Sequence, residues 1–151
     1  MTIEENKAIV RRMMKDGWNP NDQATFDDLL AEGFVNHEPG APTVQTRDEL
    51  KRFWAEHVRA FPDQHTTIDE LIGEGEQVVI RFTHHCTQTG EYQGIPPTGK
   101  SITVTGLVLY RLASGKISEL WWGYDNLGVL QQLGAIPTPE QAAAAAGSAH
   151  P

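Results

Sequence analysis

The sequence predicts an α+β domain in which N-terminal helices pack on one face of a curved antiparallel sheet and leave a cavity between the two layers. Two observations support this prediction. Apolar residues recur at helical spacing through residues 4–60, and the pattern then changes to strand-like runs through residues 66–124. A signal for one more short helix follows the last strand.

Three helices are expected in the first part of the chain. The first covers residues 4–16, with apolar side chains near i, i+4 spacing, and the second covers residues 23–31 after an Asn- and Pro-rich turn. The third runs to about residue 60 and starts at Thr46, which is followed three residues later by Glu49. A Thr and a Glu at this spacing form a capping box.

The second half of the chain has the composition of strands, with many branched and aromatic residues between turn signals. The strands are expected at residues 66–73, 77–89, 100–112 and 116–124. After the last strand, Asp125 precedes an apolar helical run and is a good candidate for the residue that caps it.

Length and charge restrict the possible functions. The chain has 151 residues, which suits one domain with one core. It has 12 Lys and Arg against 20 Asp and Glu, a formal net charge of −8 that repels phosphate backbones and anionic lipids. Nucleic acid and membrane are therefore not expected as partners. A single cysteine, Cys86, and a first stretch without an apolar run suggest a cytoplasmic protein.

The domain is expected to span residues 1–136, with residues 137–151 forming a C-terminal tail of little order. The alanine run at residues 142–146 could extend a helix, but the Gly and Ser after it make fraying equally reasonable.

Five segments together are similar to a known family. They read FVNHEP (34–39), AFPD (60–63), TGEYQGIPPTGK (89–100), GKISELW (115–121) and QQLG (131–134). In this order they resemble the SnoaL-like polyketide cyclases over about residues 6–134. The resemblance implies the cone-shaped fold of nuclear transport factor 2, ketosteroid isomerase and limonene epoxide hydrolase. It also implies a cofactor-free enzyme that closes a polyketide ring by intramolecular aldol condensation with an Asp as acid or base, and a homodimer or larger oligomer.

By its position in the motif, Asp125 matches that catalytic Asp. In an extended chain it shares a face with Trp121, and apolar neighbours would raise its pKa toward neutrality, whereas Trp122 and Tyr124 point the other way. The alternative is that Asp125 caps the following helix, which favours the charged carboxylate. The second catalytic candidate, His37, is expected to face the cavity and bind a substrate carbonyl, or else to hold the loop that follows it.

Six further residues are candidates for contact with substrate: Trp54, His57, Gln88, Tyr92, Trp121 and Arg111. The tryptophans could stack on a flat ligand or belong to the core, and His57 could equally belong to the core or its rim. Arg111 could stabilise an enolate or pair with a carboxylate such as Glu119. Gln88 stands where relatives commonly have a His. Because residues 103–123 contain no His, the proton donor would have to be another group, such as His37, Tyr92, Tyr124 or water.

No metal or other cofactor is expected. His84 and His85 alternate across a strand, so they cannot bind one ion from the same face. The expected substrate is a small hydrophobic or aromatic carbonyl compound. The function expected first is polyketide-type aldol cyclisation. The alternatives are an isomerase or epoxide hydrolase of the same fold, or a non-catalytic protein that binds a hydrophobic ligand.

Overall fold

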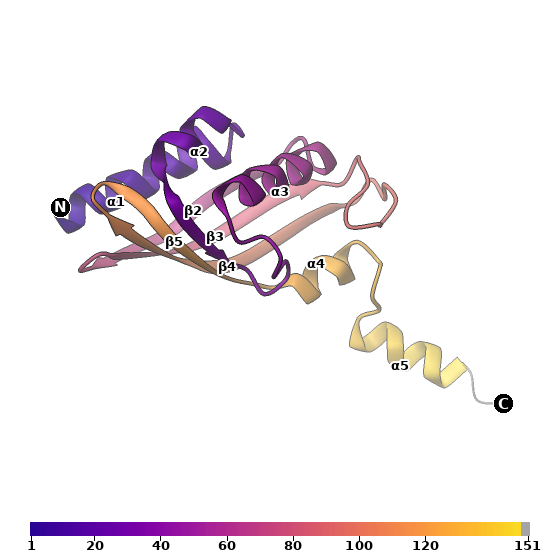
Figure 1. Ribbon diagram of the computed structural model, residues 1–151. Helices are drawn as coiled ribbons and strands as arrows, with labels where there is room; N and C mark the ends of the chain where they lie inside the picture. The colour runs from indigo at the N-terminus through magenta and orange to yellow at the C-terminus, as the bar shows by residue number, and fades with distance from the viewer. Residues whose placement is uncertain (149–151) are drawn as a thin grey trace.

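A computed structural model describes residues 1–148 and has the predicted α+β architecture (Figure 1). The helices are α1 (Ile3–Arg12), the π-helix η1 (Met13–Trp18), α2 (Gln23–Leu29), α3 (Arg47–Ala60), α4 (Asn126–Gln132) and α5 (Pro139–Ser148). The strands are β1 (Leu30–His37), β2 (His65–Glu74), β3 (Gln77–Thr87), β4 (Ser101–Ala113) and β5 (Lys116–Tyr124).

The five strands form one sheet in the order β1-β5-β4-β3-β2. The pairs from β2 to β5 are antiparallel, as the hairpin signals predicted, but β1 pairs with β5 in parallel. The expectation of a purely antiparallel sheet was therefore wrong at this edge. The short run at residues 34–37, which the sequence analysis left outside the sheet, is the second half of β1.

Local capping explains where the helices begin. The Thr46 hydroxyl accepts from the Glu49 N–H while the Glu49 carboxylate accepts from the Thr46 N–H, so the predicted capping box is present at α3. Asp22 caps α2 through the Ala24 N–H. α2 ends two residues earlier than expected, because the chain becomes extended at Leu30 and enters β1 directly.

The helices α1, α2 and α3 lie along one face of the sheet (Figure 1), where the main core forms. Trp18, at the end of η1, is almost fully buried among the rings of Phe26, Trp54 and Trp122, with ring centroids 5.0–5.4 Å apart. Its indole N–H donates to the Tyr110 hydroxyl of β4. Trp18 thus joins the helical layer to the inner face of the sheet.

The expected C-terminal tail contains the helix α5, which extends away from the rest of the molecule (Figure 1). Of the two outcomes left open for the alanine run, the structure has the helix. Residues 149–151 of the expected tail lie outside the described residues. Among residues 1–148, no helix is long and apolar enough to cross a membrane.

Candidate functional site

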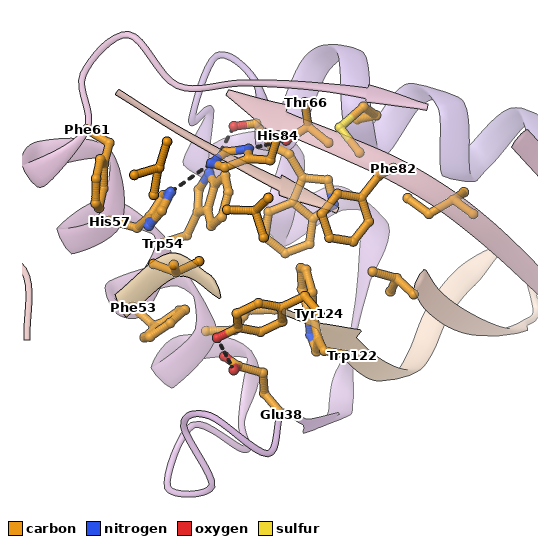
Figure 2. Close-up of a pocket in the computed structure, with 18 of the residues that line it drawn as sticks. Glu38, Phe53, Trp54, His57, Phe61, Thr66, Phe82, His84, Trp122 and Tyr124 are labelled. Carbon is orange, nitrogen blue, oxygen red and sulfur yellow. Dashed lines mark hydrogen bonds between the residues drawn. The ribbon is translucent and has the colours of Figure 1, made fainter. Parts of the chain in front are cut away.

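A cavity of about 90 Å³ lies between α3, the inner face of the sheet and α4 (Figure 2). Its walls are mainly aromatic and aliphatic, and β3, β4 and β5 supply alternate side chains because every second residue of a strand points inward. The polar groups on the wall come from Glu38, His57, Thr66, His84, Tyr92, Tyr110 and Tyr124. No Lys or Arg lines the cavity in the part of the chain that the structure describes.

Glu38 is the buried carboxylate of this cavity, and its side chain is 5% exposed. The Tyr124 hydroxyl donates a hydrogen bond of 2.7 Å to Glu38 Oε1, as Figure 2 shows. Burial raises the pKa of Glu38 above its usual range, although the hydrogen bonds from Tyr124 and the Gly40 N–H oppose this shift. Burial and the neighbouring carboxylate also raise the pKa of Tyr124, so its hydroxyl keeps its proton.

Two local features place the Glu38 carboxylate. The first is Asn36, whose side chain donates to the Val44 carbonyl (2.9 Å) and accepts from the Trp122 indole N–H (2.7 Å), which ties the end of β1 to the following loop and to β5. The second is Gly40: a Cβ at this position would lie 2.8 Å from both Glu38 Oε1 and the Tyr124 hydroxyl. A side chain here would push the carboxylate or the hydroxyl out of its present position.

A second polar group lies on the opposite side of the cavity (Figure 2). His57 Nε2, from α3, lies 3.0 Å from His84 Nε2 of β3, and His84 Nδ1 lies 2.6 Å from the Thr66 hydroxyl of β2. Burial, with a smaller contribution from nearby imidazoles, lowers the pKa of His57 to about 3 and that of His84 to about 4. Both rings are therefore neutral at physiological pH.

Cys86 brings a possible metal ligand to the same corner. Its Sγ and one ring nitrogen each of His57 and His84 all lie within 4.8 Å of one another. The sequence analysis compared only His84 with His85 and so missed this combination, in which an α3 residue joins two residues of one strand face. The group fits an ion poorly, because the two Nε2 atoms already share a proton and burial raises the pKa of Cys86 to about 12.

The sequence profile of the SnoaL-like polyketide cyclases matches residues 8–133. The chain belongs to this family. No curated protein matches the chain with significance. Solved structures share the fold: AclR, a candidate hydroxylase from Streptomyces galilaeus, has a TM-score of 0.82 at 22% identity, over 97% of this chain and 92% of that one.

Two further structures have names that match the family. A candidate SnoaL-like polyketide cyclase from Jannaschia has a TM-score of 0.79 at 25% identity, over 91% of this chain and 97% of that one. IdmH from Streptomyces antibioticus, a candidate polyketide cyclase, has a TM-score of 0.76 at 28% identity, over 85% of this chain and 98% of that one. A hydroxylase and cyclases among these neighbours show that the fold alone does not fix the reaction.

In this SnoaL-like chain, three of the eight predicted site residues line the cavity: Trp54, His57 and Tyr92. Trp54 stacks on His57, with ring centroids 4.8 Å apart, and its N–H donates to the Trp18 carbonyl. Tyr92 contacts His57 edge to face at 6.1 Å. Their roles toward a substrate stay predictions.

Asp125 does not line the cavity, contrary to the geometry expected for a catalytic base. Its exposed carboxylate accepts a 2.8 Å hydrogen bond from the Gly128 N–H and caps α4. The alternative offered by the sequence, a helix cap, is what the structure contains.

His37, Trp121 and Arg111 lie on the outer face of the sheet, away from the cavity. His37 stacks on Trp121 with ring centroids 4.9 Å apart, and the Arg111 guanidinium lies over the Trp121 ring, 5.1 Å from its centroid. Glu119 joins them, 2.8 Å from His37 Nε2 and 3.3 Å from Arg111 Nη1. The expectation that His37 faces the cavity was wrong, Trp121 and Arg111 do not line it either, and the alternative of an Arg111 ion pair with Glu119 is confirmed.

Gln88 is fully buried but serves the fold of a loop and not the cavity. Its amide donates to the carbonyls of Gly90, Ile95 and Pro96, and its carbonyl oxygen accepts from the Thr98 N–H and hydroxyl. The side chain has two N–H donors and two lone pairs, so the three acceptors share the two N–H groups and none remains for a substrate. Gln88 instead holds the loop that carries Tyr92 to the cavity.

Sequence reasoning missed four polar residues of the cavity, Glu38, Thr66, His84 and Tyr110, and considered Tyr124 only as a possible proton donor. The signal for Glu38 was present, because it lies in the FVNHEP segment beside His37. For Tyr124, the alternation of β5 was predicted correctly but the wrong face was taken as the inner one. Fully buried Leu120 shares a face with Trp122 and Tyr124, whereas charged Glu119 shares the other with Trp121.

Proposed function

We propose that this chain is an acid/base enzyme, independent of a cofactor, that removes a proton next to a carbonyl group in a small and mainly apolar molecule. Glu38 is the base, and Tyr124 orients it. In its most concrete form the reaction is the polyketide-type intramolecular aldol cyclisation of the family, in which the resulting enolate attacks a second carbonyl. The proposal thus moves the acid/base role from Asp125 to Glu38.

The observation that carries this proposal is a buried carboxylate at the wall of an apolar cavity. A general base works best when its pKa approaches the working pH, and burial raises the pKa of Glu38 in that direction. The hydrogen bond from Tyr124 fixes one carboxylate oxygen and leaves Oε2 for the proton. Positioned general bases of this kind contribute about 10²- to 10⁴-fold to rate.

The test is deuterium uptake by 2-cyclohexen-1-one in D₂O, followed by NMR. Glu38→Gln should lower the protein-dependent exchange rate by at least about 100-fold. Asp125→Asn, which changes the original candidate, and Glu119→Gln, which changes a carboxylate on the outer sheet face, should leave it within twofold. Exchange that survives Glu38→Gln but is lost in Asp125→Asn would refute the assignment.

A non-catalytic ligand-binding protein is the second candidate, because the cavity wall is almost entirely apolar. The two differ in one measurable respect. A binding protein takes up the ketone without any protein-dependent exchange. Glu38→Gln would then change neither the affinity for the ketone nor the rate of deuterium exchange. An epoxide hydrolase of the Asp-Arg-Asp type is not favoured, since no Asp or Arg lines the cavity within residues 1–148.

The homodimer implied by family membership also remains a proposal, as does a cytoplasmic location. Light scattering coupled to size exclusion should give a mass of about twice 16.7 kDa for the dimer. A monomer mass across the micromolar range would rule it out.

A further inference from the structure

The hydrogen bonds from Thr66 through His84 to His57 restrict where the protons of this chain of groups lie. A neutral imidazole carries one N–H, on either Nδ1 or Nε2. The 3.0 Å contact between the two Nε2 atoms needs one proton between them. Only two arrangements of the neutral chain satisfy this condition.

In the first arrangement, His84 donates from Nε2 to His57 and accepts the Thr66 hydroxyl proton at Nδ1. In the second, His57 donates from Nε2 to His84, and His84 donates from Nδ1 to the Thr66 oxygen. The second leaves the buried Thr66 hydroxyl proton without an acceptor, since within residues 1–148 its oxygen contacts no acceptor other than His84. A buried unpaired donor is unfavourable, so the first arrangement is preferred.

The preferred arrangement puts the proton of His57 on Nδ1. Trp54 and Phe61 cover the faces of this ring, with centroids 4.8 Å away in each case. His57 nevertheless forms part of the cavity wall, and its Nδ1 donates to no group among the described residues. The result is one unused N–H donor on the edge of a neutral ring in an apolar cavity.

We infer that the His57 Nδ1–H binds the carbonyl oxygen of the ligand, and that the ligand is an uncharged carbonyl compound. A donor requires an acceptor, which selects a carbonyl over an ammonium group. The absence of Lys and Arg from the described cavity wall disfavours a carboxylate, which would be buried without a counter-charge.

The position of the carbonyl relative to the base is the second part of the inference, and this part rests on the proposed role of Glu38. His57 and Glu38 lie on opposite sides of the cavity (Figure 2). A proton leaves toward Glu38, and the electron pair of the broken C–H bond becomes negative charge on the carbonyl oxygen. That carbonyl must therefore be bonded to the carbon that loses the proton or be connected to it through conjugated double bonds.

The first experiment observes the proton directly in the unmodified protein. Two-dimensional ¹H–¹⁵N spectra of the histidine rings distinguish protonated from bare nitrogens. We expect a proton on Nδ1 of His57 and on Nε2 of His84, and a loss of this single preference in Thr66→Val, which removes the hydroxyl at nearly constant volume. A bare Nδ1 on His57 would overturn the inference.

The second experiment uses 2-cyclohexen-1-one labelled with ¹³C at the carbonyl, with cyclohexene as the matched hydrocarbon. Binding should move the carbonyl signal downfield. His57→Phe should remove that shift and weaken ketone binding about five- to tenfold, the ordinary effect of one hydrogen bond, while cyclohexene binding is unchanged. An unshifted carbonyl signal in the bound state would refute the His57 contact.

These readouts separate the two proposals. A carbonyl shift that depends on His57, together with exchange that ignores Glu38→Gln, retains the carbonyl contact and rejects the base. Exchange that depends on Glu38, without a shift of the carbonyl signal, retains Glu38 as the base and rejects the contact between His57 and the carbonyl. A Co²⁺ titration tests the competing use of the same atoms: a thiolate-to-cobalt band that is lost in Cys86→Ser would overturn the hydrogen bond between His57 and His84 on which the inference rests, because the ion and not a shared proton would occupy the Nε2 lone pairs.

Discussion

At the scale of single residues, the environment of Glu38 should make this carboxylate costly to stability where it is charged. Its pKa is raised in the folded state, so the folded protein favours the protonated form and loses stability as pH rises through that pKa. Glu38→Gln removes the charge and keeps an acceptor for the Tyr124 hydroxyl. We therefore expect the variant to be more stable than the parent at pH 7.5.

The raised pKa of Glu38 also predicts that the stability gained by Glu38→Gln disappears in acid. Below the pKa of Glu in the unfolded chain, about 4.3, both forms of residue 38 are neutral, and urea denaturation should give similar stabilities. Glu119→Gln on the outer sheet face serves as the control. An advantage of Glu38→Gln that grows as pH falls would show that the burial argument has the wrong sign.

Tyr124 should tune the working pH of Glu38. Its hydrogen bond stabilises the carboxylate, so Tyr124→Phe raises the pKa of Glu38 further. The acid limb of the pH–rate profile for ketone exchange should move to higher pH in the variant, and the plateau should fall by less than in Glu38→Gln. A limb that stays in place would mean that another group titrates in the exchange reaction.

The residue scale is also where sequence reasoning was weakest, for a physical reason. Alternation along a strand predicts which residues share a face but not which face is inside. The pairing of Trp121 with Asp125 and of Trp122 with Tyr124 was right in parity, yet the inner face was assigned to the wrong pair. Aromatic residues occur on both faces of β5, so they do not distinguish the inner face from the outer one. The residues that do are apolar, buried Leu120 on one face and charged Glu119 on the other.

At the scale of elements, Asp125 should matter to α4 more than to chemistry. Its carboxylate accepts the Gly128 N–H, one of the helix donors that would otherwise be unpaired. Asp125→Ala should lower the free energy of unfolding by about 0.5–2 kcal/mol, whereas Asp125→Asn, which keeps a capping oxygen, should change it little. Thermal denaturation of both variants tests this, and ketone exchange should survive in each.

Most elements could be predicted from the sequence because their signals are local. The capping box at Thr46, the change of period after residue 60 and the hairpin turns each act within a few residues. The parallel pairing of β1 with β5 could not be predicted from the sequence. The paired residues are separated by more than 80 positions, and nothing in the pattern of β1 indicates which strand it pairs with. The His57–His84 contact was hidden for the same reason.

At the scale of the whole molecule, the cavity sets a size limit on the ligand. Its volume of about 90 Å³ is well below the roughly 300–1,000 Å³ of typical ligand pockets. A rigid cavity of this size accepts one ring and excludes the several fused rings of an aromatic polyketide. Turnover of such a substrate would require a wall to move, and the loop at residues 89–99 that carries Tyr92 is a wall segment outside the sheet and helices.

Thermal stabilisation by ketones of increasing size measures this limit. A ligand that binds only the folded state at 100 times its Kd adds about 2.7 kcal/mol, which for a chain of this length raises Tm by about 5–10 °C. We expect this shift with 2-cyclohexen-1-one and none with the three-ring ketone anthrone at its highest soluble concentration. Apolar area would otherwise favour anthrone, so a larger shift with anthrone would contradict the rigid cavity. Gln88→Leu, which releases the loop from its five hydrogen bonds, should then extend binding toward the larger ketone if the loop is the moving wall.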